Sequence, residues 1–599
     1  MAPALTELPV EILEAIFFHL DPQSLLAVAQ SCRRIKALTS DAPLIWRHFC
    51  QTHFKTWDSR HRMDAKFAGP LSNVDWRSVF IKRVRTERET LRLLNGVLGS
   101  QCNRTQNIDK IAEFGYDAKE ALLREATCDE AGEDFLARRY YANAILQRIQ
   151  REMVLDVWTD LGRGADVPLE KALAAFDMFT HAGEDVEFET VAHDLDMLAA
   201  GLKQQYPAFD DLSARAKAST LAFFLRERGF RGVSDSSYRA LHNSFIALVL
   251  RSETHDSLPL ISVAIFCALA RRVGLDARPC GFLYHVYCLI YAPENYTLDG
   301  IYKPTSSKDL DYIYLDPFRS SDEVLVEDLQ RRLREMGVPP LQRNSYLSDS
   351  NTRDMVLRTA RNIVASVQTI RQTDAGAFGI NASWLNVTPD MDNAFYATIW
   401  AMLILGPDDE PVSMPHVLAS SRRRQYLPYL LEHFSTHYPW DVSLLTQYVI
   451  PMFINLPEGE RLISYVDSMR RMDGIPKSPK RRAGGTANSV AFCVGQLFRH
   501  KRYQYEGVVT GWDTACDAGE EWIHNMGVDR LSGGRNQAFY HVMSCDKAMR
   551  YVAEENIIPC GVGQEPSQAM FKLAGKHFKR WDKERGVFVS NLKDEYPDD

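Results

Sequence analysis

The stretch SLPLISVAIFCALARRVGLDARPCGFLYHVYCLIYAP, residues 257–293, decides the fold of the central part of this chain. It predicts a helix that begins near Pro259, a residue suited to the first helical turn, and ends at Gly274. Short runs rich in Val, Ile and aromatic residues follow at 282–291 and 312–315, and these predict strands. The pattern indicates an α+β core in which a buried helix precedes a small sheet.

Two polar residues on the predicted strands suggest chemistry. His285 lies on the first strand, and the second leads to Asp316. A buried helix followed by a His and an Asp on successive strands is the frame of a Cys-His-Asp hydrolase, whose thiol sits at the amino end of the helix. The spacing resembles the transglutaminase-like core, particularly its bacterial branch. Aligning Arg271 and Gly274 with that family places the nucleophilic Cys at Pro259, which cannot attack a substrate.

Other thiols lie close by in the sequence, but none has the required position. Cys267 falls two turns into the helix, and Cys280 and Cys288 belong to a loop and a strand. We therefore expect His285 and Asp316 to be a hydrogen-bonded remnant that orders the strands and lines a cleft for a peptide or side chain. The alternative is an active thiol hydrolase or transglutaminase.

The amino-terminal stretch LPVEILEAIFFHLDPQSLLAVAQSCRRIKALTSDAPLIWRHF, residues 8–49, predicts three short helices. Helices this short cannot bury all their apolar side chains among themselves, so part of this surface should be covered by a partner or by the rest of the chain. The stretch resembles an F-box along its whole length. The resemblance implies docking to a Skp-type adaptor of a cullin-based ubiquitin ligase, and the expected contacts are Leu8, Pro9, Ile12, Leu13, Ile16, Leu25 and Leu26.

The carboxyl-terminal part changes to a β pattern. VGQLFRHKRYQYEGVVTGWD (494–513), GVDRLSGGRNQAFYHVM (527–543) and RYVAEENI (550–557) are short runs bounded by turn residues. They resemble the small β-barrel called YccV or HspQ, also labelled a hemimethylated-DNA-binding domain. Residues expected at a substrate or DNA contact are Arg499, Lys501, Arg502, Trp512, Trp522 and Tyr540.

Charge argues against DNA as the partner of this barrel. Residues 490–560 hold seven Lys and Arg against nine Asp and Glu, and the whole chain has a net charge of -8. Both signs are wrong for affinity driven by phosphate contacts. A protein-binding role is preferred, and a DNA-associated factor remains the third hypothesis for function.

Length and composition fit several intracellular domains. The chain has 599 residues, 45% apolar and 25% charged, with 11 Cys and no C-x-x-C spacing, which predicts a reduced protein without a disulfide framework or zinc finger. No secretion signal or membrane span is expected, and the cytoplasm, the nucleus or both are the expected location. No cofactor or metal is expected.

The order of these segments resembles the F-box only protein twenty-one-like family, including its fungal members. The expected fold is multidomain α+β, with a mainly helical body, a three-helix F-box, a papain/transglutaminase-like core and a carboxyl-terminal small β-barrel. The expected segments are an F-box (1–55), a helical region (80–250), the transglutaminase-like core with flanking helices (251–330), a second helical region (331–473), a basic linker (474–489), the barrel (490–560) and a tail (561–599). The resemblance implies a non-catalytic substrate receptor of an SCF-type ubiquitin ligase, with a Skp-type adaptor, a cullin scaffold and a protein substrate as partners.

Overall fold

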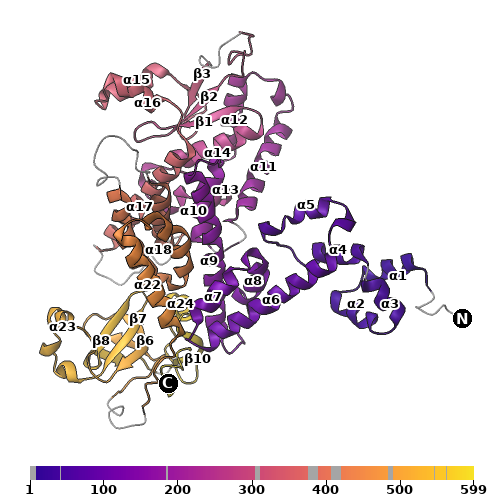
Figure 1. Ribbon diagram of the computed structural model, residues 1–599. Helices are drawn as coiled ribbons and strands as arrows, with labels where there is room; N and C mark the ends of the chain where they lie inside the picture. Colours follow the sequence, from indigo (N-terminus) through magenta and orange to yellow (C-terminus); the bar gives the residue numbers. More distant parts are fainter. Residues whose placement is uncertain are drawn as a thin grey trace. The chain divides into compact units, whose positions relative to one another are not determined.

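The structure is a computed structural model that describes residues 8–40, 42–181, 183, 186–303, 311–375, 389–406, 420–482, 490–545, 547–561 and 563–599. The chain divides into two units, one formed by Met1–Ile149 with Leu445–Asp599 and the other by Gln150–Leu444 (Figure 1). Helix α9 (Phe135–Gly162) contributes residues to both. The architecture is mainly helical with small sheets, which confirms the predicted multidomain α+β fold.

The amino-terminal region of the first unit is a cluster of short helices. Within its described residues these helices are α1 (Val10–Phe17), α2 (Pro22–Ala29), α3 (Arg33–Ser40) and α4 (Pro43–Thr52). The Asp21 carboxylate accepts the backbone N–H groups of Gln23 and Ser24, so it caps α2. The sequence predicts three helices, and α4 is a separate helix because Pro43 begins a new first turn after Ala42.

Further helices belong to the first unit. They are α5 (Met63–Ala68), α6 (Trp76–Gly99), α7 (Arg104–Ala112), α8 (Lys119–Ala126), α21 (Ile450–Phe453) and α22 (Pro457–Gly474). Asp473, near the end of α22, accepts the backbone N–H groups of Thr105 and Gln106 at 3.0 Å each. This carboxylate therefore caps α7 from a segment more than 360 residues away in the sequence.

The carboxyl-terminal domain of the first unit contains an antiparallel sheet. Its described strands are β5 (Leu497–His500), β6 (Glu506–Asp513), β7 (Phe539–Ser544), β8 (Met549–Ala553) and β9 (Ile557–Pro559), in the order β8-β7-β6-β5-β9. A short helix, α23 (Glu520–Met526), lies between β6 and β7 in the chain.

The sheet must be strongly curled. Its edge strands β8 and β9 follow each other in the chain through a 3-10 turn at Glu554–Asn556. Four steps of chain span at most about 14 Å, whereas the edges of a flat five-stranded sheet would lie about 19 Å apart. The strands therefore wrap around a common core, as the barrel prediction requires.

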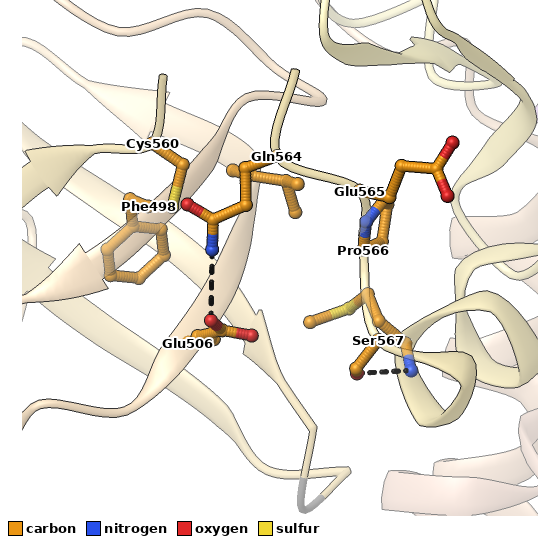
Figure 2. A pocket seen from close by; sticks show the side chains of 9 residues that line it. Phe498, Glu506, Cys560, Gln564, Glu565, Pro566 and Ser567 are labelled. Atoms are coloured by element: carbon orange, nitrogen blue, oxygen red, sulfur yellow. Dashed lines mark hydrogen bonds between the residues drawn. The ribbon is translucent and has the colours of Figure 1, made fainter. Parts of the chain in front are cut away.

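Residues 561–599 are folded onto this sheet and are not a free tail. They form α24 (Gln568–Ala574), β10 (Phe578–Asp582) and β11 (Val587–Ser590), and Phe578 and Phe588 are buried in the same core as Val508 and Val509. Figure 2 shows Gln564 pointing toward Glu506 of β6, with Nε2 3.1 Å from Oε1. The prediction of a tail is wrong because the Phe and Leu side chains of this stretch belong to the barrel core.

The described part of the predicted basic linker is also held in place. The Lys480 Nζ lies 2.8 Å from an oxygen of Asp513, and the Arg482 Nε lies 2.6 Å from Asp599. The backbone N–H of Lys480 donates to the Glu595 carbonyl at 2.7 Å. The prediction of a basic linker is corrected for residues 480–482, whereas residues 475–479 are exposed and residues 483–489 lie outside the described residues.

The second unit surrounds a four-stranded antiparallel sheet of β1 (Asp276–Cys280), β2 (Tyr287–Tyr291), β3 (Tyr312–Leu315) and β4 (Glu323–Val324), in that order. Its helices are α10 (Leu169–Thr180), α11 (Phe188–Gln205), α12 (Ala214–Glu227), α13 (Ile246–Arg251), α14 (Pro259–Arg272), α15 (Val326–Glu335), α16 (Pro340–Leu347), α17 (Thr352–Ala375), α18 (Met391–Leu405), α19 (Ser420–His437) and α20 (Val442–Leu444).

Helix α14 is the buried centre of this unit. It packs on β1 and β2 and also contacts α10, α11 and α12, so nearly every position of the helix is covered (Figure 1). This explains why its sequence is apolar all round and carries no polar face. Among the described residues, no helix combines the length and the apolar character needed to cross a membrane.

Candidate functional site

The first candidate site is the outer surface of the amino-terminal helices. Leu13, Phe17, Leu25, Ile35 and Trp46 form their shared core, and each is at most 3% exposed. The opposite faces of α1 and α2 are apolar as well. A small domain that leaves apolar side chains in water after filling its core has a surface suited to a partner.

The predicted adaptor contacts divide between these two faces. Ile12 is 50% exposed, Leu26 46% and Ile16 37%, while Pro9 is exposed and Leu8 half-buried. The sequence prediction that Leu13 and Leu25 also contact the partner is corrected, because both are fully buried in the core. Their helical spacing places them toward the core and not on the outer strip.

Two further exposed apolar residues were missed by the sequence prediction. Val10 is 38% exposed and Leu44 is 44% exposed. Ile12 and Ile16 are one helical turn apart, so they form a continuous strip along α1. The exposed apolar strip is defined here as Pro9, Val10, Ile12, Ile16 and Leu26.

The second candidate site is the pair that the sequence placed on neighbouring strands. The His285 Nε2 lies 3.0 Å from the Asp316 Oδ2, and both side chains are nearly buried. Asp316 directly follows β3 as predicted. His285 lies in the turn before β2 and not on the strand itself, because residues 281–286 form the connection from β1.

This turn is firmly held. The Arg358 guanidinium donates to the carbonyl oxygens of Phe282 and His285 at 2.8 and 2.9 Å. The ring of Tyr287 lies 4.6 Å from that of His285. The Asp316 Oδ1 is buried without a hydrogen-bond partner within the described part of the chain. The pair is therefore fixed in place and has one acceptor that the protein does not use.

The amino end of α14 lies beside this pair. Gly232 donates its N–H to the Phe318 carbonyl and forms a bridge with Ser257, two residues before Pro259. The Phe318 ring in turn lies 5.7 Å from His285. Pro259 is the first residue of α14, where a helix needs no backbone N–H. The structure thus confirms that Pro259 begins this helix, and its correspondence to the family's nucleophile position stays a prediction.

The nearby thiols are poorly suited to replace it. The Cys267 Sγ lies 3.6 Å from the Cys288 Sγ in the interior. Burial raises the pKa of Cys280 to about 12 and that of Cys288 well above its usual value, with a further contribution from Cys267 to the latter. A thiol with a raised pKa remains protonated at neutral pH, and the thiol is a weak nucleophile.

A groove of about 460 Å³ lies at the other end of the same sheet. It is lined by the start of α12, the beginning of β1, the end of β2 and the loop at 293–300, with Lys217, Asp276, Tyr291, Tyr296 and Asp299 among its residues. Because β2 runs from the His285 turn to Tyr291, the groove and the His285–Asp316 pair lie about 14 Å or more apart. The groove is large enough to bind a ligand and is separate from the His285–Asp316 pair.

The third candidate site is the carboxyl-terminal domain, where the predicted contacts also divide. Arg499, Lys501 and Arg502 are exposed, and Trp522 is half-buried. The prediction for Trp512 and Tyr540 is corrected, because they are 3% and 0% exposed.

The two buried aromatic residues belong to the internal structure of this domain. The Trp512 Nε1 donates to Asp599 at 2.8 Å, and the Tyr540 hydroxyl donates to Glu554 at 2.6 Å. Both polar groups therefore have hydrogen-bond partners inside the domain and are not available to bind a ligand.

Asp513 is a half-buried carboxylate that contacts three polar side chains of this domain. It lies 2.8 Å from Lys480 and 3.1 Å from His541, and it accepts the Tyr551 hydroxyl at 2.9 Å. Burial opposes ionisation, but the hydrogen bonds from these three side chains hold the pKa of Asp513 far below its usual value. The carboxylate stays ionised and ties residues 480–482 to the sheet.

One group among the described residues has the composition of a metal site. Asp392, His433 and His437 place their potential ligand atoms within 4.8 Å of one another. The sequence analysis expected no metal. The spacing of two His residues four positions apart was the signal available for this pair, because such residues share one face of a helix.

Comparison with known families gives three matches along the chain. Residues 5–52 match a family model described as F-box-like, residues 189–361 match the transglutaminase-like superfamily, and residues 490–585 match the family described as hemimethylated DNA-binding protein YccV like. These matches define the class: a multidomain F-box-type protein that combines a transglutaminase-like region with a YccV-like domain.

Comparison with individual proteins gives matches along nearly the whole chain. The chain is 21% identical to F-box only protein 21 of Homo sapiens, 22% to that of Pongo abelii and 21% to that of Mus musculus. Each alignment covers 99% of this chain and 92% of the relative. No solved structure matches the chain. The resemblance to the F-box only protein twenty-one-like family is thus confirmed over nearly the whole sequence.

Proposed function

We propose that this chain is the substrate-receptor subunit of an SCF-type cullin–RING ubiquitin ligase. The observation that carries the proposal is the exposed apolar strip on α1 and α2 of the F-box-like region. Amphipathic helices that present such a strip dock into apolar grooves of partner helices, and a Skp-type adaptor is the partner that an F-box implies. The receptor would then hold a target lysine near the ubiquitin-conjugating enzyme, so that proximity supplies the catalysis.

Recognition of the substrate is assigned to the second unit and the carboxyl-terminal domain. The groove beside Tyr291 and Tyr296 is large enough for a short peptide segment and offers aromatic faces together with carboxylates. Arg499, Lys501 and Arg502 give the YccV-like domain a second exposed surface, which we assign to protein rather than DNA because the domain is net acidic. We propose that the transglutaminase-like region itself performs no covalent chemistry, since Pro259 stands at the helix end.

The adaptor contact is tested by co-purification of the full chain with a Skp-type adaptor. Ile12→Glu and Leu26→Glu place charges on the exposed apolar strip, and both should abolish recovery of the adaptor. The matched control is Phe223→Glu on α12, because Phe223 is 51% exposed but lies outside the F-box-like region. Equal recovery by all three variants would refute the assignment of the strip.

Substrate recognition needs a separate readout, because a variant can keep the adaptor and lose its target. Tyr296→Ala should leave adaptor recovery unchanged and reduce the set of proteins that accumulate near the receptor when the proteasome is inhibited. Proximity labelling with and without the inhibitor measures this set. An unchanged set would remove the groove from the proposed function while leaving the adaptor contact intact.

A second candidate function is a thiol hydrolase, which the geometry of His285 and Asp316 favours. The test is labelling of the full chain with an active-site thiol probe. Selective labelling of one cysteine that disappears in His285→Ala would support the enzyme and overturn the non-catalytic assignment. Uniform, slow labelling that His285→Ala leaves unchanged would support the receptor.

A further inference from the structure

Helices α18 and α19 bring three potential metal ligands together in the second unit. Asp392 lies in the first turn of α18, and His433 and His437 lie near the carboxyl end of α19. The ligand atoms of all three side chains are within 4.8 Å of one another, and all three residues are half-buried.

The local structure explains this convergence. The Asp390 side chain accepts the backbone N–H groups of Asp392 and Asn393, which fixes the start of α18 and the direction of Asp392. His433 and His437 are four residues apart, so they share one face of α19. The ring of Phe395, one turn after Asp392, lies 5.0 Å from the ring of His433 and positions it against α18.

His433 contributes a ring nitrogen that the surrounding protein leaves unused. The His433 Nε2 is buried and has no hydrogen-bond partner among the residues that the structure describes. Leaving a buried nitrogen unsatisfied is unfavourable, and a metal bond would remove that cost.

Arg371 forms an ion pair with the carboxylate of this group. The Arg371 Nη2 lies 3.3 Å from the Asp392 Oδ1, and its guanidinium lies 5.4 Å from the Phe395 ring centroid. The Arg371 side chain is 46% exposed, so it can turn toward water without leaving a buried charge behind. The Arg371 ion pair and a bound metal ion are alternative ways to neutralise the negative charge of Asp392.

We propose that Asp392, His433 and His437 bind one Zn²⁺ ion that joins α18 to α19, with water as the fourth ligand. Two imidazoles and one carboxylate form a donor set that suits Zn²⁺ and disfavours Mg²⁺ and Ca²⁺, which prefer oxygen ligands alone. At Zn–ligand distances of about 2.0 to 2.1 Å, tetrahedral ligands lie about 3.3 Å apart. The three side chains therefore need to close by at most about 1.5 Å, which rotation about their χ angles provides.

The position of the site suggests what the ion would do. Pro428 lies inside α19 and removes one of its backbone hydrogen bonds, which weakens the helix one turn before His433. A metal bond from the following two turns to α18 would hold this weakened helix in place. The site is separate from the proposed adaptor strip and groove, so it does not depend on the proposed function.

The experiment is a Co²⁺ titration of the full, metal-stripped chain in a phosphine reductant, followed by displacement with Zn²⁺. The expected result is one equivalent of Co²⁺ with visible d–d bands and without the thiolate charge-transfer absorption that binding to Cys267 and Cys288 would give. His433→Gln should weaken binding by more than about 100-fold, because even the loss of an outer hydrogen-bond partner costs 10- to 100-fold. Arg371→Gln should tighten binding by about tenfold, because it removes a competing positive charge.

The controls separate loss of the site from loss of the fold. His193→Gln removes an exposed His on α11 and should leave the stoichiometry at one. Circular dichroism of the metal-free variants must show the wild-type melting temperature, and added Zn²⁺ should raise that temperature for wild type but not for His437→Gln. Binding that His433→Gln and His437→Gln leave unchanged, or binding with thiolate absorption, would overturn the proposal.

Discussion

The exposed apolar strip allows a quantitative prediction for adaptor affinity. Complete burial of a Val, Leu or Ile side chain contributes about 1.5 to 3 kcal/mol. Ile12, Ile16 and Leu26 are 50%, 37% and 46% exposed, so a partner that covers all three recovers about 2 to 4 kcal/mol. The triple variant Ile12→Ala, Ile16→Ala, Leu26→Ala keeps only the Cβ contacts. It should therefore bind the adaptor roughly 30- to 150-fold more weakly, a loss of about 2 to 3 kcal/mol.

The assay is calorimetric titration of the full chain with a Skp-type adaptor, together with urea unfolding of each variant. The triple variant should unfold close to the wild-type urea midpoint because its residues lie at the surface. Leu13→Ala removes a fully buried side chain one position away and should instead lower the free energy of unfolding by about 2 to 5 kcal/mol. Met197→Ala on α11, where Met197 is 60% exposed, should change neither quantity.

One result would refute the reasoning. If the triple variant binds the adaptor within a factor of three of wild type while retaining its stability, the strip is not the docking surface. Affinity would then have to come from polar contacts, which the exposed fractions of these three side chains do not measure.

Three further predictions concern stability and the central pair. Burial raises the pKa of Asp177 to about 8, above its unfolded value near 4, so the unfolding free energy of wild type should fall by up to about 1.4 kcal/mol per pH unit from pH 4 to 8. Asp177→Asn should lack this pH dependence of the free energy of unfolding, as measured by urea unfolding. Wild-type and variant pH profiles that run parallel would contradict the prediction. Gly495→Ala should cost more than about 2 kcal/mol in thermal unfolding, because φ is +90° and the new Cβ would lie 1.9 Å from the Phe588 carbonyl oxygen. Gly534→Ala, with φ +54° and open space around it, should cost about 1 kcal/mol, and equal costs would contradict the steric argument. Pro259→Cys should place a thiol at the amino end of α14, where the helix dipole favours the thiolate; iodoacetamide should therefore label it faster than Cys280 and Cys288 although position 259 is buried, and His285→Ala in the same chain should slow that labelling. Labelling that does not depend on His285 would show that the His285–Asp316 pair does not activate a thiol at the amino end of α14.

The local elements were predictable where the sequence pattern is strong. The runs YEGVVTGWD and FYHVMS become β6 and β7, and Pro259 begins α14 as expected, because strand alternation and first-turn proline are local signals. The pairing of His285 with Asp316 was also anticipated, since residues at matching ends of adjacent strands meet in space.

The remaining features depend on contacts between distant parts of the sequence. Nothing local to Lys480 or Arg482 indicates that Asp513 and Asp599 bind them, so a basic stretch was read as a linker. Trp512 and Tyr540 were expected at the surface because aromatic residues occur at both barrel cores and binding rims. Trp512 is covered by Tyr596 and Asp599, and Tyr540 by Phe492 and Glu554, and no short-range pattern reveals these contacts.

The folding of residues 561–599 onto the sheet sets the smallest piece of this domain that evolution or an experimenter can move between proteins. Met570, Phe578, Phe588, Leu592 and Tyr596 fill the same core as the strands of 497–559. A transplant that ends at residue 560 would leave these cavities open to water, and one that begins at 490 would lose the Lys480 and Arg482 contacts. A movable piece must therefore contain at least residues 480–599, and because Leu136 of α9 also lies in this core, a domain transplanted with shorter boundaries should reach its new host unfolded.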